Sequence, residues 1–307
     1  MKRTNLRRAG LSIVAAALLT GVTACGGSGG SGDSDGSGGS GGSGKGGDGS
    51  PPLSPVAALL TAEKSTDGAD SAKVESTTTM GSVMSMTADG ALGWGDGLTG
   101  TLTITYTGGT MADTMRQMGT TSMEARYLPD AYYARMGDTF AEQAGGRHWI
   151  RYAYDDLESL GGSSGAYLKD QMQNTTPNQS VKLLLASGDV REVGEEKVRG
   201  QRTTHYSGTV EVADLAEKNS NLSQSQLDDL RKTLEQAGVT TETVDIWVDD
   251  RDLLVKKVEK GETTAGAYAQ TAYYTDYGTE VSAEVPPASD TADFSELVKQ
   301  QGAGAGS

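Results

Sequence analysis

Apolar and polar residues alternate along several segments of the chain, with the period of two that marks a β-strand with one dry and one wet face. In the segment 98–106 threonines occupy the odd positions, and the even positions, broken only by Gly100, carry Leu98, Leu102, Ile104 and Tyr106. The segments 203–212 and 243–249 alternate in the same way. Three such strands far apart in the sequence predict one large antiparallel sheet, solvated on its outer face.

Turn residues join further strands into hairpins. The hairpin 124–136 turns at Pro129-Asp130, and the hairpin 245–258 turns at the acidic run 249–252. Both turns carry the residue types that favour reversal of the chain. Hairpins of this kind indicate that neighbouring strands of the sheet pair antiparallel.

Helical signals precede and interrupt the predicted sheet. Ser54 is placed as an N-cap with Pro55 at the first helical position. The stripe that follows reads Val56, Leu59, Leu60 and Glu63. A second helical region, between about 155 and 187, ends with Gly188 as its stop and carries Val181, Leu184 and Leu185.

A third helix is predicted close to the last strands of the sheet. Ser223 and Gln226 form a capping box, and the helix closes at Gly238. Its apolar face carries Leu227, Leu230 and Leu234. The segment from Thr107 onward is ambiguous, because its methionines fit helical spacing while its Gly and Thr residues also fit a loose strand; they are Met111, Met115 and Met118.

The apolar stripes of these helices must be buried, and the dry face of the sheet is the obvious place. The sequence therefore predicts an α+β fold with a large curved antiparallel sheet. We expect this half-barrel to carry its helices on the concave face or at its mouth.

The first 24 residues have the layout of an export signal. Four basic residues precede the apolar run 11–19, which is too short to span a membrane, since a spanning helix needs about 20 apolar residues. Val22-Thr23-Ala24-Cys25 resembles the bacterial lipobox, in which small residues precede a cysteine that is acylated. A diacylglyceryl group on Cys25 supplies two chains, whereas a single chain gives only marginal membrane binding.

We therefore expect residues 1–24 to be a lipoprotein signal peptide and Cys25 to anchor the chain at the outer face of the cytoplasmic membrane. An ordinary secretory leader followed by a coincidental cysteine is the alternative. Export through the general pathway or, given Arg7-Arg8, through the twin-arginine pathway is left open.

Glycine and serine dominate the residues after the cysteine. Of the 25 residues in 26–50, 14 are Gly and 7 are Ser, which predicts a disordered spacer over 25–52. The root-mean-square end-to-end distance of such a spacer is roughly 25–30 Å. The folded domain is expected over 53–298, and a flexible tail over 299–307.

Charge and composition exclude several function classes. Without the four basic residues of the leader, 22 Lys and Arg stand against 41 Asp and Glu, a net charge of −19. Nucleic acid is therefore not expected as a partner. A single Cys cannot form an internal disulfide, a CxxC redox pair or a zinc site.

The residues that could carry catalysis or bind a metal have simpler interpretations. His205 lies on the outward face of its strand and His148 precedes a predicted strand, so we expect structural or solvated roles for both. The run containing Asp249, Asp250 and Asp252 lacks the spacing of a calcium loop and is interpreted as a solvated turn. Glycine runs in the spacer follow no strand, which argues against nucleotide binding. No catalytic residue, cofactor or metal is predicted.

Five segments carry a resemblance to a known lipoprotein family. They read EARYLPDAYYARM (124–136), HWIRY (148–152), LLLASGDVREVGEEKVRGQRTTHYSGTVEV (183–212), VDIWVDD (244–250) and YTDYGTEVSAEVPPASDTADF (274–294). Their order over about 240 residues, together with the lipobox, is similar to that of the LppX/LprG/LprA/LprF family, which has a LolA-like half-barrel fold. The resemblance covers roughly 54–298.

The resemblance implies a protein that binds and transfers an acylated lipid or lipoglycan, whose chains lie inside the half-barrel, and it brings no catalytic residues. Transferring a 16-carbon chain through water costs on the order of 12 kcal/mol, which a carrier must offset with apolar contacts. The residues expected to line the cavity are Leu102, Ile104, Tyr106, Val181, Leu184, Leu185, Val210, Leu227, Leu230, Leu234, Val244 and Ile246.

Two other functions stay open at the level of the sequence. One is a sensor or protein-interaction module of the same fold, without lipid transfer. The other is an envelope enzyme, which is disfavoured because no nucleophile, base and orienting residue converge. The expected partners are the membrane, through Cys25, a lipid or lipoglycan, and an envelope transporter or another protein.

Overall fold

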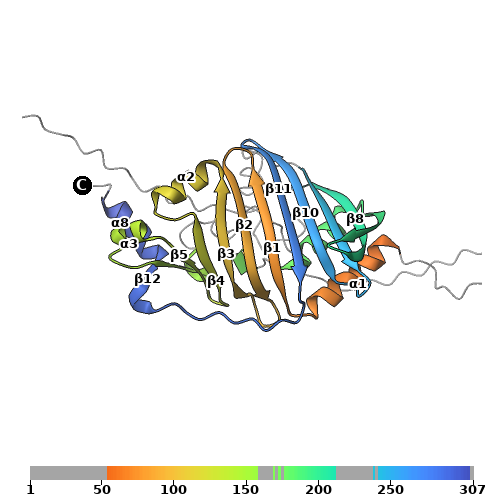
Figure 1. Cartoon of the computed structure of the whole chain (residues 1–307), viewed down its shortest axis with the longest axis horizontal. Coiled ribbons are helices and arrows are strands. Elements are labelled where there is room, and N and C mark those ends of the chain that lie inside the picture. The colour runs from red at the N-terminus through yellow and green to blue at the C-terminus, as the bar shows by residue number, and fades with distance from the viewer. Residues whose placement is uncertain are drawn as a thin grey trace, which may run out of the picture.

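The computed structural model describes residues 54–157, 169, 172–173, 176–211, 238 and 241–304, without the side chains of 186 and 300–304. One broad sheet dominates it, with short helices packed against the sheet and at its ends (Figure 1). The described strands are β1 (Ser71–Met80), β2 (Met84–Gly93), β3 (Thr99–Gly108), β4 (Ser122–Tyr127), β5 (Ala131–Arg135), β6 (Trp149–Ala153), β7 (Arg191–Val198), β8 (Gln201–Glu211), β9 (Thr241–Asp249), β10 (Leu254–Thr263), β11 (Gly266–Thr275) and β12 (Thr291–Asp293). The described helices are α1 (Pro55–Asp67), α2 (Gly109–Gln117), α3 (Asp138–Gln143), α5 (Pro177–Ser187), the 3-10 helix η1 (Ala288–Asp290) and α8 (Phe294–Gly304).

The described strands form a single open sheet in the order β12-β6-β5-β4-β3-β2-β1-β11-β10-β9-β8-β7. Its two edges, β12 and β7, do not meet, so the sheet is not closed into a barrel. The predicted fold class, α+β with a large curved sheet, is confirmed, and so are both predicted hairpins, β4–β5 and β9–β10.

One strand pair departs from the predicted antiparallel arrangement. The chain leaves β11, runs along the ends of the strands and adds β12 at the far edge, as the blue segment in Figure 1 shows. This route brings β12 alongside β6 in the parallel direction. The sheet is therefore mixed, although every other pair of neighbours is antiparallel.

Side chains alternate between the two faces of the sheet as predicted. Leu102 and Ile104 of β3 are buried, whereas Thr103 between them is exposed on the opposite face. Val244 and Ile246 of β9 are completely buried on the same face as Leu102. We call this face, which packs against α5, the inner face of the sheet, and the opposite face the outer face.

Two glycines allow close approach of the backbones in the middle of the sheet. Gly90 of β2 and Gly100 of β3 have φ values of 157° and 145°, which other residues rarely adopt. A Cβ atom on Gly90 would lie 2.1 Å from the carbonyl oxygen of Thr101, and one on Gly100 would lie 2.2 Å from that of Ala91. Register shifts in the β2–β3 and β9–β10 pairs add bulges. Glycines and bulges of this kind bend a sheet.

Helix α1 begins as predicted. The Oγ of Ser54 accepts a hydrogen bond of 3.3 Å from the backbone N–H of Ala57, and Pro55 opens the first turn. This side-chain cap satisfies one of the N–H groups that a helix start leaves unpaired.

The predicted buried stripe of α1 is wrong in part. Val56 and Leu60 are 47% and 52% exposed, whereas Leu59, Ala62 and Thr66 are fully buried. The buried face follows the spacing i, i+3, i+7 and is one residue wide at each turn. The apolar residues beside it therefore remain in solvent.

Helix α5 ends where the sequence predicts, with Gly188 in the left-handed conformation at φ 78°. It packs against α1 and over β8, β9 and β10. Val181 and Leu184 are completely buried and Leu185 is partly buried. Gly208 of β8 permits this contact, since a Cβ atom there would lie 2.7 Å from the Cδ1 of Leu184.

The methionine-containing segment after β3 is a helix, α2, rather than a loose strand. Met115 is buried, Met111 packs against the inner-face residues, and Met118 is the C-cap. Gly109, with φ 79°, begins α2 directly after β3.

The third predicted helix, with Leu227, Leu230 and Leu234, lies outside the described residues. The predicted signal peptide, Cys25 and the spacer lie outside them as well. Within the part of the chain that the structure describes, every helix is too short or too polar to cross a membrane.

Candidate functional site

The inner face forms one continuous apolar cluster that extends across the sheet from β5 to β8. Of the predicted lining residues, seven are buried members of this cluster, namely Leu102, Ile104, Val181, Leu184, Val210, Val244 and Ile246. Tyr106 and Leu185 pack against it while partly buried. The three leucines of the third predicted helix lie outside the described residues, so the structure assembles nine of the twelve positions.

Methionine is prominent on one part of this inner face. Met80 and Met84 pair across the β1–β2 hairpin, and Met86 pairs with Tyr106 of β3. Described methionines that belong to the cluster or pack against it are Met80, Met84, Met86, Met111, Met123, Met136 and Met172. Unbranched thioether side chains adapt their shape easily and are common at surfaces that bind varied partners.

Tyrosines occupy the inner face at the β3–β6 end. The rings of Tyr127 and Tyr132 are 5.1 Å apart, and those of Tyr132 and Tyr152 are 5.7 Å apart, measured between centroids. Burial raises the pKa of the Tyr127 hydroxyl to about 12 and that of Tyr132 well above its ordinary value. The buried hydroxyl of Tyr154 has no hydrogen-bond partner within the described structure. This end of the inner face therefore offers neutral hydroxyl groups among apolar side chains.

A group of charged side chains interrupts the apolar inner face below α5. Lys257 and Glu259 of β10 form an ion pair of 3.0 Å, and their side chains are only 9% and 1% exposed. The Oγ of Ser180, on α5, donates a hydrogen bond of 2.6 Å to the same Oε1 atom of Glu259. The remaining oxygen of Glu259, Oε2, is buried and lacks a hydrogen-bond partner among the described residues.

Glu242 of β9 adds a second carboxyl group to the inner face. It pairs with Gly261, which places it diagonally across from Glu259 on the same face. Although Glu242 as a whole is partly exposed, its Oε1 atom is buried and unpaired in the described structure. Burial, and then the nearby charge of Glu259, raise the pKa of Glu242 well above its ordinary value, and Lys257 lowers it by a smaller amount.

The alternation pattern of the sequence did not reveal this charged group. In β10 the bulge next to Leu254 breaks the period of two, so Val255 and Val258 both lie on the outer face. One signal was available: Lys257 and Glu259 are opposite Ile246 and Val244, whose inward direction the sequence predicts.

His205 lies on the outer face, as predicted, but it is far from solvated. Its ring stacks on that of Trp247 with centroids 4.2 Å apart, and its Nε2 lies 2.9 Å from Asp245. Trp247 is in turn covered by the ammonium group of Lys256, 3.7 Å from the ring centroid, and its indole N–H donates to Glu196. The outer face of β8–β10 therefore carries a small shielded cluster where the sequence predicts a simple wet face.

His148 ties the C-terminal segment to the sheet. Its Nδ1 and its backbone N–H both lie 2.8 Å from the Oδ1 of Asp290, and its Nε2 is 3.4 Å from Asp138. These contacts lower the pKa of Asp290, the backbone hydrogen bond being the largest cause. His148 directly precedes β6, consistent with the predicted strand entry.

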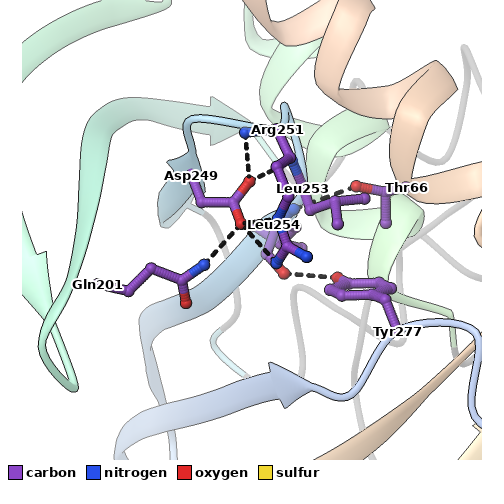
Figure 2. Close-up of polar contacts among 7 residues, drawn as sticks. All are labelled: Thr66, Gln201, Asp249, Arg251, Leu253, Leu254 and Tyr277. Atoms are coloured by element: carbon purple, nitrogen blue, oxygen red, sulfur yellow. Dashed lines mark hydrogen bonds and ion pairs between the residues drawn. The ribbon is translucent and has the colours of Figure 1, made fainter.

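Hydrogen bonds hold Asp249 at the start of the acidic turn between β9 and β10, as Figure 2 shows, whereas Asp250 and Asp252 are exposed. The Oδ1 of Asp249 accepts the backbone N–H groups of Arg251 and Leu253 at 2.9 and 3.0 Å. Its Oδ2 accepts from Gln201 at 2.6 Å and from the guanidinium of Arg251 at 2.8 Å. The expectation of a solvated turn is wrong for Asp249, whose side chain is 2% exposed because these donors enclose it.

The same turn fastens helix α1 to the sheet. The backbone N–H of Leu254 donates to the Oγ1 of Thr66 at 3.1 Å, and the hydroxyl of Tyr277 donates to the carbonyl of Leu254 at 2.5 Å (Figure 2). Because donors already occupy both oxygens of Asp249, the turn has no free carboxylate pair for a cation. No group of three or more His, Cys, Asp or Glu among the described residues could hold a metal ion.

Comparisons with known proteins complete this picture. No protein-family model matches the chain. The chain is 56% identical over 310 residues to the Streptomyces coelicolor protein named "Putative lipoprotein SCO4650", covering 98% of this chain and 100% of that protein. It is also 62% identical over 251 residues to the Streptomyces griseus protein named "Uncharacterized 31.2 kDa protein in rplA-rplJ intergenic region", covering 81% of this chain and 82% of that protein.

Two solved structures of mycobacterial proteins are similar at lower identity. LprF from Mycobacterium bovis gives a TM-score of 0.46 at 14% identity, covering 78% of this chain and 99% of its own. LppX from Mycobacterium tuberculosis gives 0.45 at 14% identity, covering 75% and 98%. The identity to the Streptomyces coelicolor protein, over that protein's whole length, shows that this chain belongs to its lipoprotein family.

Proposed function

We propose that this protein is a membrane-anchored lipoprotein that binds an acylated lipid or lipoglycan on the inner face of its open sheet and transfers it within the cell envelope. One observation carries the proposal: buried apolar side chains line the inner face from β5 to β8, interrupted only by the group around Lys257 and Glu259 among the described residues, while the sheet edges stay apart. An open sheet of this kind can receive a long acyl chain from one side, whereas a closed and fully packed barrel cannot.

The energetics of lipid binding match the composition of this face. The transfer of a 16-carbon acyl chain from an apolar environment into water costs a free energy on the order of 12 kcal/mol, at about 0.8 kcal/mol for each CH₂ group. Aliphatic, tyrosine and methionine side chains of the inner face provide replacement contacts. The methionines near the β1–β2 hairpin suit chains of different length and branching, because their side chains adapt.

The anchor in this proposal is Cys25, which lies outside the described residues. Two acyl chains on this cysteine would hold the protein at the outer face of the cytoplasmic membrane. The Gly- and Ser-rich residues 26–50 would then let the domain reach over the bilayer surface by roughly 25–30 Å.

The proposed function is binding and transfer without a chemical step. Both histidines engage carboxylate groups in structural contacts, His205 with Asp245 and His148 with Asp290. Among the described residues, the charged contacts of both rings are with further carboxylates, Asp138 for His148 and Glu196 for His205. The inner face offers a ligand apolar contacts, hydroxyl groups and one charged group, which suit non-covalent binding.

Photo-crosslinking directly tests where the acyl chain binds. The full-length protein is incubated with a 16-carbon fatty acid carrying a diazirine, irradiated, and digested for mass spectrometry. We expect labels on inner-face residues of β3 and β9, such as Leu102 and Val244. Labels confined to the outer face, or an unlabelled protein, would contradict the proposal.

A pair of variants on one strand sharpens this experiment. Ala88 of β2 lies on the inner face opposite Ile104, whereas its neighbour Thr87 is exposed on the outer face. Ala88→Phe should fill part of the inner face and reduce labelling at least threefold, and Thr87→Phe should leave labelling unchanged. Circular dichroism of both variants verifies that the fold is retained.

A further inference from the structure

The charged group on the inner face, formed by Glu242, Lys257 and Glu259, lacks hydrogen-bond donors for two of its buried oxygen atoms. Ser180 and Lys257 both donate to the Oε1 atom of Glu259, which leaves Oε2 without a donor. The Oε1 atom of Glu242 is likewise buried without a donor among the described residues. An unpaired buried carboxylate oxygen is destabilising, and such atoms in a folded protein call for a ligand or another explanation.

The group also has one ammonium for two carboxyl groups. Lys257 pairs with Glu259, and Glu242 keeps its proton because burial and the charge of Glu259 raise its pKa. A second group of positive sign would allow Glu242 to ionise and form a buried pair of its own. A primary ammonium brings one positive charge and three N–H donors, enough to serve both unpaired oxygens.

We propose that Glu242 and Glu259 bind the ammonium head of a cationic amphiphile whose hydrocarbon chain lies along the apolar inner face. This inference rests on the proposed function and adds the head-group class to it. Other head groups fit less well. A phosphate or carboxylate would place further negative charge beside the two carboxyl groups, and a hydroxyl would donate a hydrogen bond without bringing a positive charge.

The neighbouring residues allow head and chain to bind together. Glu259 is flanked by Val244 on β9 and Gln270 on β11, and Gln270 donates a hydrogen bond of 3.2 Å to Thr78. The next position along the inner face of β9 is Ile246, which is completely buried in the apolar cluster. A chain attached to an ammonium at Glu259 therefore meets apolar surface at its first carbons.

Three amphiphiles with the same chain and different heads test the inference. The full-length protein, released from detergent micelles into a native mass spectrometer, is titrated with hexadecylammonium, hexadecan-1-ol and hexadecanoate. We expect hexadecylammonium to bind with a Kd roughly tenfold or more below that of the alcohol, and hexadecanoate to bind most weakly. Equal affinity for the ammonium and the alcohol, or a preference for hexadecanoate, would overturn the inference.

Variants then assign the preference to this site. Glu242→Gln should remove most of the preference for the ammonium while leaving the affinity for hexadecan-1-ol within about twofold. Glu262→Gln, at an exposed position of β10, should leave both affinities unchanged. A preference that persists in Glu242→Gln would place the ammonium elsewhere. The titrations of the unaltered protein do not depend on the folding of any variant. If none of the three amphiphiles binds, the proposed function itself is overturned.

Discussion

The buried carboxyl group of Glu242 makes a specific prediction about pH and stability. Burial and the charge of Glu259 raise its folded-state pKa well above its ordinary value of 4.5. The folded protein therefore keeps this proton over a range of pH in which the unfolded chain has lost it. Replacing Glu242 by glutamine removes the titration while keeping a side chain of the same shape.

The sign and size of the effect follow from proton linkage. Below about pH 4.5 both states hold the proton, so the full contribution of Glu242 to stability is present. As the pH rises toward the folded-state pKa, only the unfolded state releases the proton, and the free energy of unfolding falls by up to about 1.4 kcal/mol per pH unit. Between pH 5 and pH 7 the loss reaches at most about 2.7 kcal/mol.

Urea unfolding at pH 5, 6 and 7, followed by tryptophan fluorescence, measures this loss. All other titrating groups are shared, so the difference between the Glu242→Gln variant and the unaltered protein reports the titration of Glu242 together with its interaction with Glu259 and Lys257. We expect the variant to gain stability relative to the unaltered protein as the pH rises, by about 1–2.7 kcal/mol over the two units. The exposed Glu262→Gln control should show no such gain. A difference that is constant with pH, or that shrinks as the pH rises, would refute the reasoning.

Three further predictions concern the anchor, a helix contact and the ordered turn. Cys25→Ala should move the protein from the membrane fraction to the soluble fraction, as followed by immunoblotting, because the two-chain anchor is lost; continued tight membrane association would contradict the lipobox. Gly208→Ala places a Cβ 2.7 Å from the Cδ1 of Leu184 and should lower the free energy of unfolding by about 1–3 kcal/mol in urea melts; an unchanged midpoint would mean that α5 does not pack on β8. Asp249→Asn weakens a buried acceptor of several N–H groups and should cost about 1.5–3 kcal/mol in the same assay, whereas the exposed Asp250→Asn should cost less than about 0.5 kcal/mol.

The strands were predictable because one face of the sheet is dry and the other is mostly wet. Leu102, Ile104, Val244 and Ile246 all lie on the predicted face, since a shift of one residue would turn every apolar side chain outward. The start of α1 was predictable for a different reason, because Ser54 provides a local side-chain cap that needs no tertiary contact.

The errors occur where distant parts of the chain decide the environment. Leu60 has the spacing of a buried helix residue, yet only Leu59 and the small residues beside it face a neighbour. Asp249 has the composition of a solvated turn, yet Gln201 from β8 and the turn's own N–H groups enclose it. Neither outcome can be read from local spacing.

The charged group of the candidate site was missed for a related reason. The bulge in β10 hides the inward direction of Lys257 and Glu259, and only the pairing with β9 reveals it. Glu242 is the second residue of β9, whose next inward residues are apolar, so the pattern alone gives it no special weight.

Mass spectrometry of the lipids that accompany the full-length protein from native membranes tests the account most directly. We expect an acylated amphiphile that stays with the protein through purification, at about one molecule per protein molecule, and is displaced by an added 16-carbon competitor. A folded protein that yields no enriched lipid, compared with an unrelated anchored protein from the same membranes, would contradict it.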